Sequence, residues 1–303
     1  MWHHDPVTTA TAPANTAGIE ICYETFGDDA RPTIMLIMGL GGQMISWPDE
    51  FCEVLVERGY HVVRFDNRDV GRSTWLDTPD FDPGVALMEL MGGGQPEVPY
   101  MLDDLAADAV SLLDHLGIES AHIVGVSMGG MIAQSIAIGW PDRTRSLTSI
   151  MSTTGEPDVG QPRPEVLGAL LESAPADPEA AVQAGVEIDR IISSPDHFDE
   201  ALSRAKTERA VARGVNPAGV ARQMAAIVSS PPRNDGLESL SMPTLVIHGR
   251  QDPLVTFDGG ERTAKLVPGA EFMAIDDMGH DIPVAHHARV TEAITTLAAR
   301  ADA

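Results

Sequence analysis

Runs of apolar residues alternate with helical patterns over the first half of the chain. Residues 33–38 (TIMLIM) and 121–126 (AHIVGV) are almost entirely apolar, which is typical of strands buried on both faces of a sheet. Between them, residues 102–116 place leucine and alanine at the i, i+3, i+4 spacing of an amphipathic helix, and Gly117 ends it. Strands separated by helices predict a mostly parallel sheet with helices on both faces.

The same reasoning, applied along the whole chain, predicts eight strands and nine helices. The predicted strands cover residues 7–12, 19–26, 33–38, 61–65, 121–126, 147–151, 243–248 and 271–275, and the first two should form a hairpin. The predicted helices cover residues 48–58, 102–116, 128–139, 165–172, 178–192, 198–213, 217–228, 259–266 and 285–299.

The strand pattern is interrupted in the middle of the chain. Between residues 153 and 238, proline-rich breaks separate helical segments, and no strand is evident. Asp177-Pro178 and Asn216-Pro217 each combine an N-cap residue with a proline in the first helical turn. We therefore expect a core domain formed by residues 1–152 and 239–303, with residues 153–238 inserted as a helical cap.

Composition and charge restrict the classes of partner. The 303-residue chain has 45 Asp and Glu against 20 Lys and Arg, a formal charge of −25, which disfavours nucleic acid and anionic membranes as partners. The N-terminus shows no signal-peptide pattern, and no run approaches the ~18–20 apolar residues of a membrane helix. We expect a cytoplasmic protein without stable membrane insertion; a homo-oligomer is compatible with the sequence. Cys22 and Cys52 are expected to be reduced, partly buried thiols.

The segment 125–129 (GVSMG) fits the G-x-S-x-G motif of a nucleophile elbow. The motif alone is weak evidence, but here a buried-type strand precedes it and a helix follows. Such a turn holds the serine in a strained conformation, and the flanking Gly125 and Gly129 relieve the crowding. Ser127 is therefore the candidate nucleophile. The alternative is a small-residue strand–helix turn with an idle serine.

A serine nucleophile needs a base, and the base needs an orienting acid. In a sheet of this type the three follow the order Ser, Asp or Glu, His, each in a loop at the carboxyl end of a strand. The strand ending at residue 248 runs into Asp252, and the strand ending at residue 275 runs into His280. We therefore choose Asp252 as the acid and His280 as the base.

Several other residues compete for these roles. Asp276 and Asp277 are close to His280 in sequence but are interpreted as solvated loop carboxylates, and Asp281 as solvated or capping. The other histidines have structural interpretations. His248 is still inside its strand, and His286 and His287 fall in the last helix as surface or packing residues.

Acyl transfer also needs hydrogen-bond donors for the oxyanion of its tetrahedral intermediate. One is the backbone N–H of Met128, which follows the nucleophile. The other is expected from the loop after residues 33–38, where we choose Leu40, with Gly39 and Gly41 as one-residue alternatives. The glycines of this loop let the backbone approach the substrate, so Gly39 and Gly41 are candidate substrate-binding residues. Met131 is a third, because methionines cluster near the motifs; core filling is the alternative.

Together, these motifs resemble the α/β-hydrolase superfamily. The residues that carry the resemblance are the segments 38–42 (MGLGG), 66–73 (DNRDVGRS), 125–130 (GVSMGG), 252–253 (DP) and 279–280 (GH). Within the superfamily the chain is similar to bacterial serine esterases of the aclacinomycin methylesterase type and to actinobacterial lipases and esterases. The resemblance covers about residues 19–155 and 238–300 and is weak across the insertion.

The resemblance implies the α/β-hydrolase fold, an eight-stranded, mostly parallel sheet with a helical cap. It also implies a carboxylic-ester hydrolase that uses Ser127, Asp252 and His280 on a small-molecule ester, without metal or cofactor. Met38 departs from the family, in which many members have histidine before the glycine of the oxyanion loop. The segment 66–73 holds two aspartates, but its two arginines favour an ion-paired structural loop over a metal site.

Two alternatives to ester hydrolysis remain on this scaffold. A cofactor-free perhydrolase, or haloperoxidase-like enzyme, would use the same triad with peroxide in place of water. A non-catalytic ligand-binding protein of this fold would keep the scaffold without turnover. Epoxide hydrolases and haloalkane dehalogenases carry Asp at the elbow, so Ser127 argues against both. For the esterase, we expect hydrolysis of short- to medium-chain nitrophenyl esters.

Overall fold

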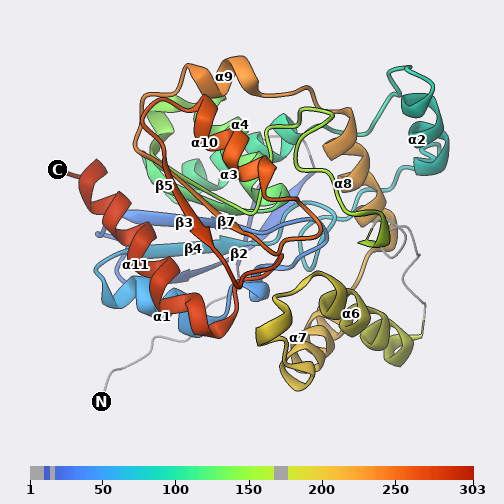
Figure 1. The fold of residues 1–303 in the computed structure, drawn as a ribbon, viewed down its shortest axis with the longest axis horizontal. Coiled ribbons are helices and arrows are strands. Elements are labelled where there is room, and N and C mark those ends of the chain that lie inside the picture. The colour runs from blue at the N-terminus through green and yellow to red at the C-terminus, as the bar shows by residue number, and fades with distance from the viewer. Residues whose placement is uncertain (1–9, 14–17, 167–176) are drawn as a thin grey trace.

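The computed structural model describes residues 10–13, 18–166 and 177–303 (Figure 1). Eight strands form one sheet in the order β1-β2-β4-β3-β5-β6-β7-β8. The strands are β1 Ala10–Pro13, β2 Glu20–Phe26, β3 Thr33–Ile37, β4 His61–Phe65, β5 Ala121–Val126, β6 Thr144–Ile150, β7 Thr244–Gly249 and β8 Glu271–Ile275. β2 is antiparallel to both β1 and β4, and every other pairing is parallel, which confirms the hairpin and the mostly parallel sheet.

Helices cover both faces of this sheet because its central strands are buried on both sides. In β3, Ile34 and Leu36 pack into one core, and Met35 and Ile37 pack into the other, since successive side chains point to opposite faces. Helices α1 (Asp49–Glu57) and α11 (Val284–Ala301) close the first core. The second lies under α3 (Leu102–His115), α4 (Met128–Gly139) and α10 (Asp258–Leu266), as Figure 1 shows.

Between β6 and β7 the described chain is helical. It forms α6 (Pro178–Ile192), α7 (Glu200–Arg213), α8 (Pro217–Ser229) and α9 (Asn234–Glu238), with a short 3-10 helix, η3 (Pro195–His197). The predicted N-caps are present, because Asp177 accepts a hydrogen bond from the Ala180 amide and Asn216 from that of Gly219. Of the four helices, α9 packs on α4 and α10 and so belongs to the layer over the sheet. The helix predicted over residues 165–172 lies mostly outside the described residues.

Buried ion pairs join α7 and α8 to the loop that follows β4. The Arg213 guanidinium, at the end of α7, donates to Asp66 at 2.5 Å. Arg222, on α8, donates to both carboxylate oxygens of Asp69, at 2.7 and 2.8 Å. The side chains of both aspartates are fully buried, which agrees with the prediction of an ion-paired loop over residues 66–73. These pairs hold the helical insertion against the carboxyl end of the sheet.

Two helices and part of a strand were not predicted. Helix α2 (Pro83–Met91) projects from the body of the protein in Figure 1 and exposes Val85 and Met88, so it lacks a one-sided apolar pattern. Helix α9 has five residues, too few for a periodic pattern. β6 begins at Thr144, three residues before the predicted start, because its polar residues are buried by bonding to β5, for example Ser146 to His122 at 2.9 Å.

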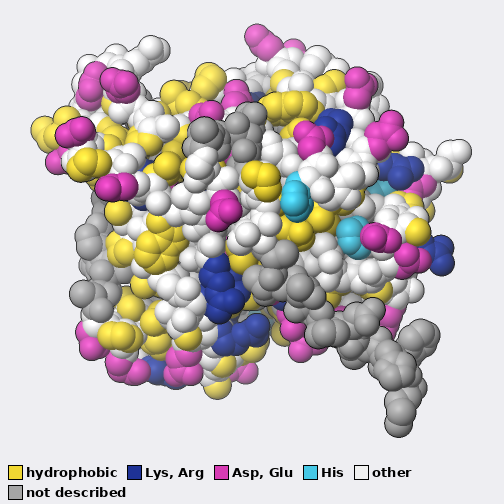
Figure 2. All heavy atoms as spheres, turned by 180° about the vertical axis from the view of Figure 1, so that it is seen from behind, with side chains coloured by type: hydrophobic (Ala, Val, Ile, Leu, Met, Phe, Trp, Pro, Cys, Tyr) yellow, Lys and Arg dark blue, Asp and Glu magenta, His cyan; other side chains and the backbone are white. Residues whose placement is uncertain are grey.

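The face shown in Figure 2 carries many acidic side chains, as the composition predicts, and both cysteines are free thiols. Acidic side chains are spread over the face shown in Figure 2, while basic side chains gather in fewer places. Among the described helices, none combines the length and apolar character needed to cross a membrane. Cys22 and Cys52 are both free and buried, and burial raises the pKa of Cys52 to about 12. Neither thiol is therefore set up as a nucleophile.

The remaining short 3-10 helices are η1 Met44–Ser46 and η2 Pro141–Arg143.

Candidate active site

Ser127 occupies the sharp turn between β5 and α4. Its backbone has φ 57° and ψ −123°, a conformation that side-chain-bearing residues rarely adopt. The turn tolerates only glycine on either side: a Cβ on Gly125 would lie 2.0 Å from the carbonyl oxygen of Gly129, and one on Gly129 would lie 2.2 Å from that of Ile37. The structure thus contains the predicted elbow, with the Ser127 side chain at the N-terminus of a helix.

The structure brings Ser127, Asp252 and His280 together at the carboxyl edge of the sheet. His280 Nδ1 lies 2.7 Å from Asp252 Oδ2, and His280 Nε2 lies 3.0 Å from Ser127 Oγ. A carboxylate only accepts hydrogen bonds, so the imidazole proton lies on Nδ1 and Nε2 is free to accept the serine hydroxyl proton. The three residues follow β5, β7 and β8, whose parallel arrangement places their loops side by side.

The Asp252 carboxylate is fully buried, and its acceptor sites are occupied. Oδ1 accepts the backbone N–H groups of Leu254 and Val255, both at 2.9 Å, while Oδ2 faces His280. His248 Nε2 donates to the Val255 carbonyl at 2.8 Å and also lies 3.5 Å from Oδ2. Burial by itself raises the pKa of Asp252, but His280 and His248 outweigh it and lower the pKa to about 2. His248, predicted to be structural, thus also contacts the carboxylate.

Within the described residues, the loop after β3 offers two amides without a hydrogen-bond partner next to Ser127. The Gly41 N–H donates to Gln223 Oε1 at 2.9 Å, and the Gly42 N–H donates to the Gly39 carbonyl at 3.1 Å. Within the described part of the chain, neither the Gly39 N–H nor the Leu40 N–H has such a partner. Gly39 is close to the nucleophile, because a Cβ there would lie 3.0 Å from Ser127 Cβ. These contacts remove Gly41 from the alternatives for the oxyanion donor and leave Leu40, our first choice, with Gly39 as the other alternative.

Two of the candidate substrate-binding residues differ in their surroundings. Gly41 lines a cavity of about 120 Å³ together with Val220 of α8 and residues 214–217. Met131, on α4, is 6% exposed and packs in the hydrophobic core, so its contribution to a substrate pocket stays a prediction. Gln223, which joins α8 to both Gly41 and the Arg68 carbonyl, was not foreseen. No local pattern marks such a residue, because its partners are 155 and 182 positions away.

The backbone around His280 is held by the last residue of α6 and the residues that follow it. The His280 N–H donates to the Ile192 carbonyl at 2.7 Å, and the Gly279 N–H donates to Ser194 Oγ at 2.8 Å. Asp281, predicted to be solvated or capping, accepts from both the amide and the hydroxyl of Ser194, at 2.7 and 2.5 Å. The helical insertion therefore contacts both the loop after β3 and the loop after β8 that carries His280, called here the histidine loop.

The competing residues have other partners. Asp276 is exposed and pairs with Arg250 on the surface. His287 Nε2 donates to the Ile282 carbonyl, just before the start of its helix, and the ring packs edge-on against Phe51, as a packing residue would. Asp277 is only half exposed, and its carboxylate contacts both His197 and His286. None of these residues reaches Ser127 or Asp252 through a hydrogen bond in the described structure.

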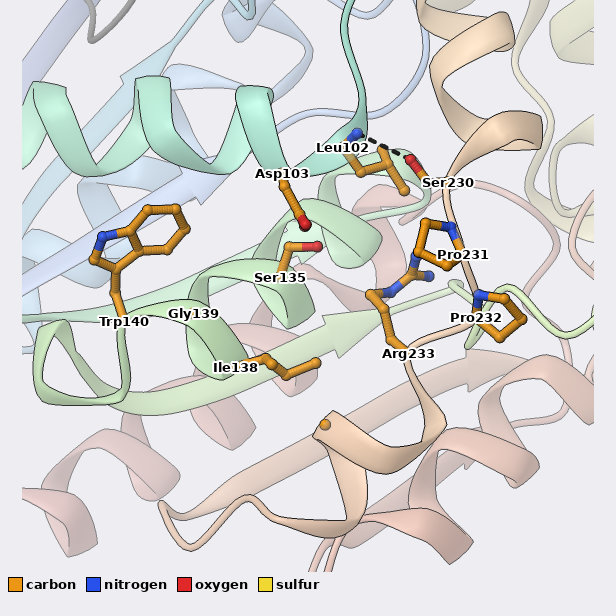
Figure 3. A pocket seen from close by; sticks show the side chains of 11 residues that line it. Leu102, Asp103, Ser135, Ile138, Gly139, Trp140, Ser230, Pro231, Pro232 and Arg233 are labelled. Atoms are coloured by element: carbon orange, nitrogen blue, oxygen red, sulfur yellow. Dashed lines mark hydrogen bonds between the residues drawn. The ribbon is translucent and has the colours of Figure 1, made fainter. Parts of the chain in front are cut away.

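A second cavity, of about 290 Å³, lies away from these residues (Figure 3). It is bounded by α3, α4 and the segment after α8, where the Leu102 N–H donates to Ser230 Oγ at 3.0 Å. Arg233 reaches from this segment to Gln134 Oε1 and to the Thr153 carbonyl. The lining of this cavity contains none of Ser127, Asp252 and His280, so it is not the place where Ser127 would meet a substrate.

Comparison with known proteins agrees with this fold and geometry. The family described as the alpha/beta hydrolase fold matches residues 32–286. The chain therefore belongs to the α/β hydrolase fold family, which confirms the resemblance and the predicted fold class.

Among curated proteins, the chain is 32% identical to rhodomycin D methylesterase of Streptomyces peucetius, covering 91% of this chain and 94% of that protein. It is 31% identical, with the same coverage, to rhodomycin D methylesterase of Streptomyces sp. strain C5. Among solved structures, the enol-lactonase of Burkholderia xenovorans superposes with a TM-score of 0.74 at 22% identity, covering 96% of this chain and 100% of that chain. A thermophilic esterase of Thermogutta terrifontis gives 0.72 at 22% identity, covering 97% and 99%.

Proposed function

We propose that this protein hydrolyses carboxylic esters through an acyl-enzyme intermediate on Ser127. The observation that carries the proposal is the position of one imidazole, which lies 3.0 Å from the Ser127 hydroxyl and 2.7 Å from the Asp252 carboxylate. This is the arrangement that a general base needs to activate a serine, with an acid that orients it. The two methylesterase relatives support ester hydrolysis as the reaction.

In the first half of the reaction, Ser127 Oγ attacks the ester carbonyl carbon while its proton moves to His280 Nε2. The resulting imidazolium is stabilised by the buried Asp252 carboxylate, which keeps its charge because its pKa is about 2. The negative charge that develops on the carbonyl oxygen is stabilised by the amides of Leu40 and Met128. His280 then gives the proton to the leaving alkoxide, and the C–O bond breaks to release the alcohol.

In the second half, water replaces the alcohol. His280 removes a proton from the water as it attacks the acyl carbon, and the same two amides stabilise the second oxyanion. The proton returns to Ser127 Oγ as its bond to the acyl carbon breaks, so the acid leaves and the enzyme is restored. His280 Nε2 therefore takes up and releases the transferred proton in both halves of the reaction.

The substrate is proposed to be the methyl ester of a small molecule. Two relatives that align over 91% of this chain are named methylesterases, which supports methanol as the leaving alcohol. We further propose that residues 153–238, apart from α9, which packs in the layer over the sheet, act as a cap over the core formed by residues 1–152 and 239–303. This is supported by α7 and α8, which are anchored to Asp66 and Asp69 at the carboxyl edge of the sheet.

A fluorophosphonate probe followed by an ester panel tests the proposal. The probe should add its mass to one peptide, the one containing Ser127, because that hydroxyl is paired with an imidazole that a buried carboxylate orients. The unlabelled protein should hydrolyse nitrophenyl acetate and rhodomycin D, and the labelled protein should not. Labelling that leaves Ser127 unmodified, or turnover that survives full labelling, would contradict the mechanism. Peracid formation from acetate and hydrogen peroxide, in excess of hydrolysis, would instead support a perhydrolase.

The low pKa of Asp252 predicts how stability depends on pH. The pKa falls from 3.8 to about 2 on folding, so the carboxylate stabilises the folded state above pH 3.8, and this is lost as pH falls through about 2. Asp252→Asn should lower the free energy of unfolding by about 2 kcal/mol at pH 6. The difference in the free energy of unfolding between Asp252→Asn and the unmodified protein should shrink between pH 4 and 2, as measured by urea unfolding.

Asp276→Asn is the matched control for Asp252→Asn, because that carboxylate is 89% exposed. It should change the free energy of unfolding by less than about 0.5 kcal/mol at every pH. A difference for Asp252→Asn that stays constant from pH 6 to pH 2 would show that the carboxylate is not selectively stabilised in the folded protein.

A further inference from the structure

Two histidines and a carboxylate from separate elements converge beside the histidine loop. His197 ends η3 in the helical insertion, Asp277 follows β8, and His286 lies in the first turn of α11. His197 Nε2 is 2.7 Å from Asp277 Oδ2, and His286 Nε2 is 2.9 Å from Asp277 Oδ1. One side-chain nitrogen or oxygen from each of the three residues lies within 4.8 Å of the other two.

The arrangement goes beyond what an ion pair requires. Both imidazoles direct Nε2 toward the same carboxylate, and their rings meet edge-on, with centroids 5.2 Å apart at 75°. Two imidazole nitrogens and a carboxylate oxygen form a donor set typical of zinc-type transition metals. Tetrahedral coordination at about 2.0–2.1 Å would place the donor atoms roughly 3.4 Å apart, so the three side chains need to close by little more than 1 Å.

Access and charge favour a cation here. The side chains are 25%, 43% and 13% exposed for His197, Asp277 and His286, which leaves an open side for entry and for water as a further ligand. Arg250, which follows β7 and bonds to the end of β8 through its backbone, donates its side chain to Asp276 rather than to Asp277. The Asp277 carboxylate thus contacts two imidazoles, those of His197 and His286, and an imidazole binds a metal ion as a neutral ligand.

We propose that His197, Asp277 and His286 together bind a zinc-type divalent metal ion. Binding through Nε2 requires each imidazole to carry its single proton on Nδ1, so the protons now donated to Asp277 move within their rings or leave to solvent. The metal then replaces the two N–H···O hydrogen bonds with three coordinate bonds. The inference is independent of ester hydrolysis, since neither the ligands nor the binding step involves Ser127.

The position of the site gives binding a structural consequence. His197 follows the segment in which the Ile192 carbonyl and Ser194 Oγ hold the backbone of His280 and Gly279. Asp277 is three residues before His280 in the same loop. A metal bound to His197, Asp277 and His286 would join this segment of the insertion to the histidine loop and to α11. Because such a link exists only in the folded chain, it should raise the melting temperature.

Calorimetric titration of the full chain with Zn²⁺ at pH 7.5 tests the proposal. The background is a His3→Ala/His4→Ala variant, because adjacent histidines at the N-terminus can bind metal themselves. We expect one equivalent of Zn²⁺ to bind and the melting temperature to rise with Zn²⁺ and to fall back with a chelator. His197→Gln and Asp277→Asn should each weaken binding at least tenfold and abolish the rise in melting temperature.

His115→Ala serves as the matched control, because that histidine is exposed at the end of α3 and is not one of the three ligands. It should bind Zn²⁺ as the background variant does. Zn²⁺ binding that is absent from the background, or that survives in both His197→Gln and Asp277→Asn, would overturn the proposal and leave the three residues as an ion pair. Circular dichroism of each variant without metal separates lost binding from lost folding.

Discussion

Ser127→Ala is expected to reduce kcat for ester hydrolysis by about a thousandfold or more while leaving the protein folded. The substitution removes the only atom that the proposed mechanism bonds to the acyl group, and His280 then has no hydroxyl to deprotonate. Stability should change little, because alanine has the same Cβ as serine and experiences the same positive φ of 57°. Initial rates with nitrophenyl acetate and a thermal melt measure both quantities.

Ser111→Ala provides the comparison for Ser127→Ala. This serine lies on α3, and its hydroxyl donates within its own helix to the Ala107 carbonyl at 2.9 Å, so its loss should leave kcat unchanged. If Ser127→Ala turned over esters at a rate close to that of Ser111→Ala, another residue would have to be the nucleophile. Residual activity well above the rate in water, by contrast, is expected from the oxyanion donors alone.

Arg222→Ala is expected to lower the free energy of unfolding by about 3–5 kcal/mol. The guanidinium makes two hydrogen bonds to Asp69, at 2.7 and 2.8 Å, and the side chains are 6% and 0% exposed. Removing the arginine leaves a buried carboxylate with the Tyr100 hydroxyl, at 2.8 Å, as its remaining side-chain donor. Urea unfolding, followed by fluorescence, gives the difference.

Arg209→Ala is the matched variant on the neighbouring helix. Arg209 is exposed on α7 and makes no hydrogen bond or ion pair within the described residues, so its loss should change the free energy of unfolding by less than about 0.5 kcal/mol. Equal effects of the two substitutions would show that the Arg222–Asp69 pair contributes no more to stability than an exposed side chain does.

The sequence predicts the sheet well because its central strands carry an unambiguous pattern. Residues 33–38 and 121–126 are apolar on both faces, and the strands found there differ from the prediction by one residue at most. The pattern fails where burial has another cause. The first residues of β6 are polar yet buried, because Ser146 bonds to His122 across the sheet, and hydrophobic periodicity cannot reveal such a bond.

The proposed triad was predictable for a different reason. In a parallel sheet, loops at the carboxyl ends of strands meet at one edge, so the order of Ser127, Asp252 and His280 along the chain was enough to bring them together. The residues that support them were not predictable. Gln223 and Ser194 act through partners 182 and 85 residues away, and only the folded helical insertion places them there.

These two supporting residues have a consequence for protein engineering. Gln223 fixes the Gly41 amide, and Ser194 fixes the Gly279 amide, so the insertion between β6 and β7 is part of the framework on which the reacting groups are mounted. Replacing this insertion with that of another esterase to change substrate choice would therefore remove the hydrogen bonds that hold the Gly41 and Gly279 amides. It would also replace the α8 residues that line the cavity beside Gly41. A functional chimera would have to bring an amide acceptor at position 223 and a hydroxyl at position 194 with it.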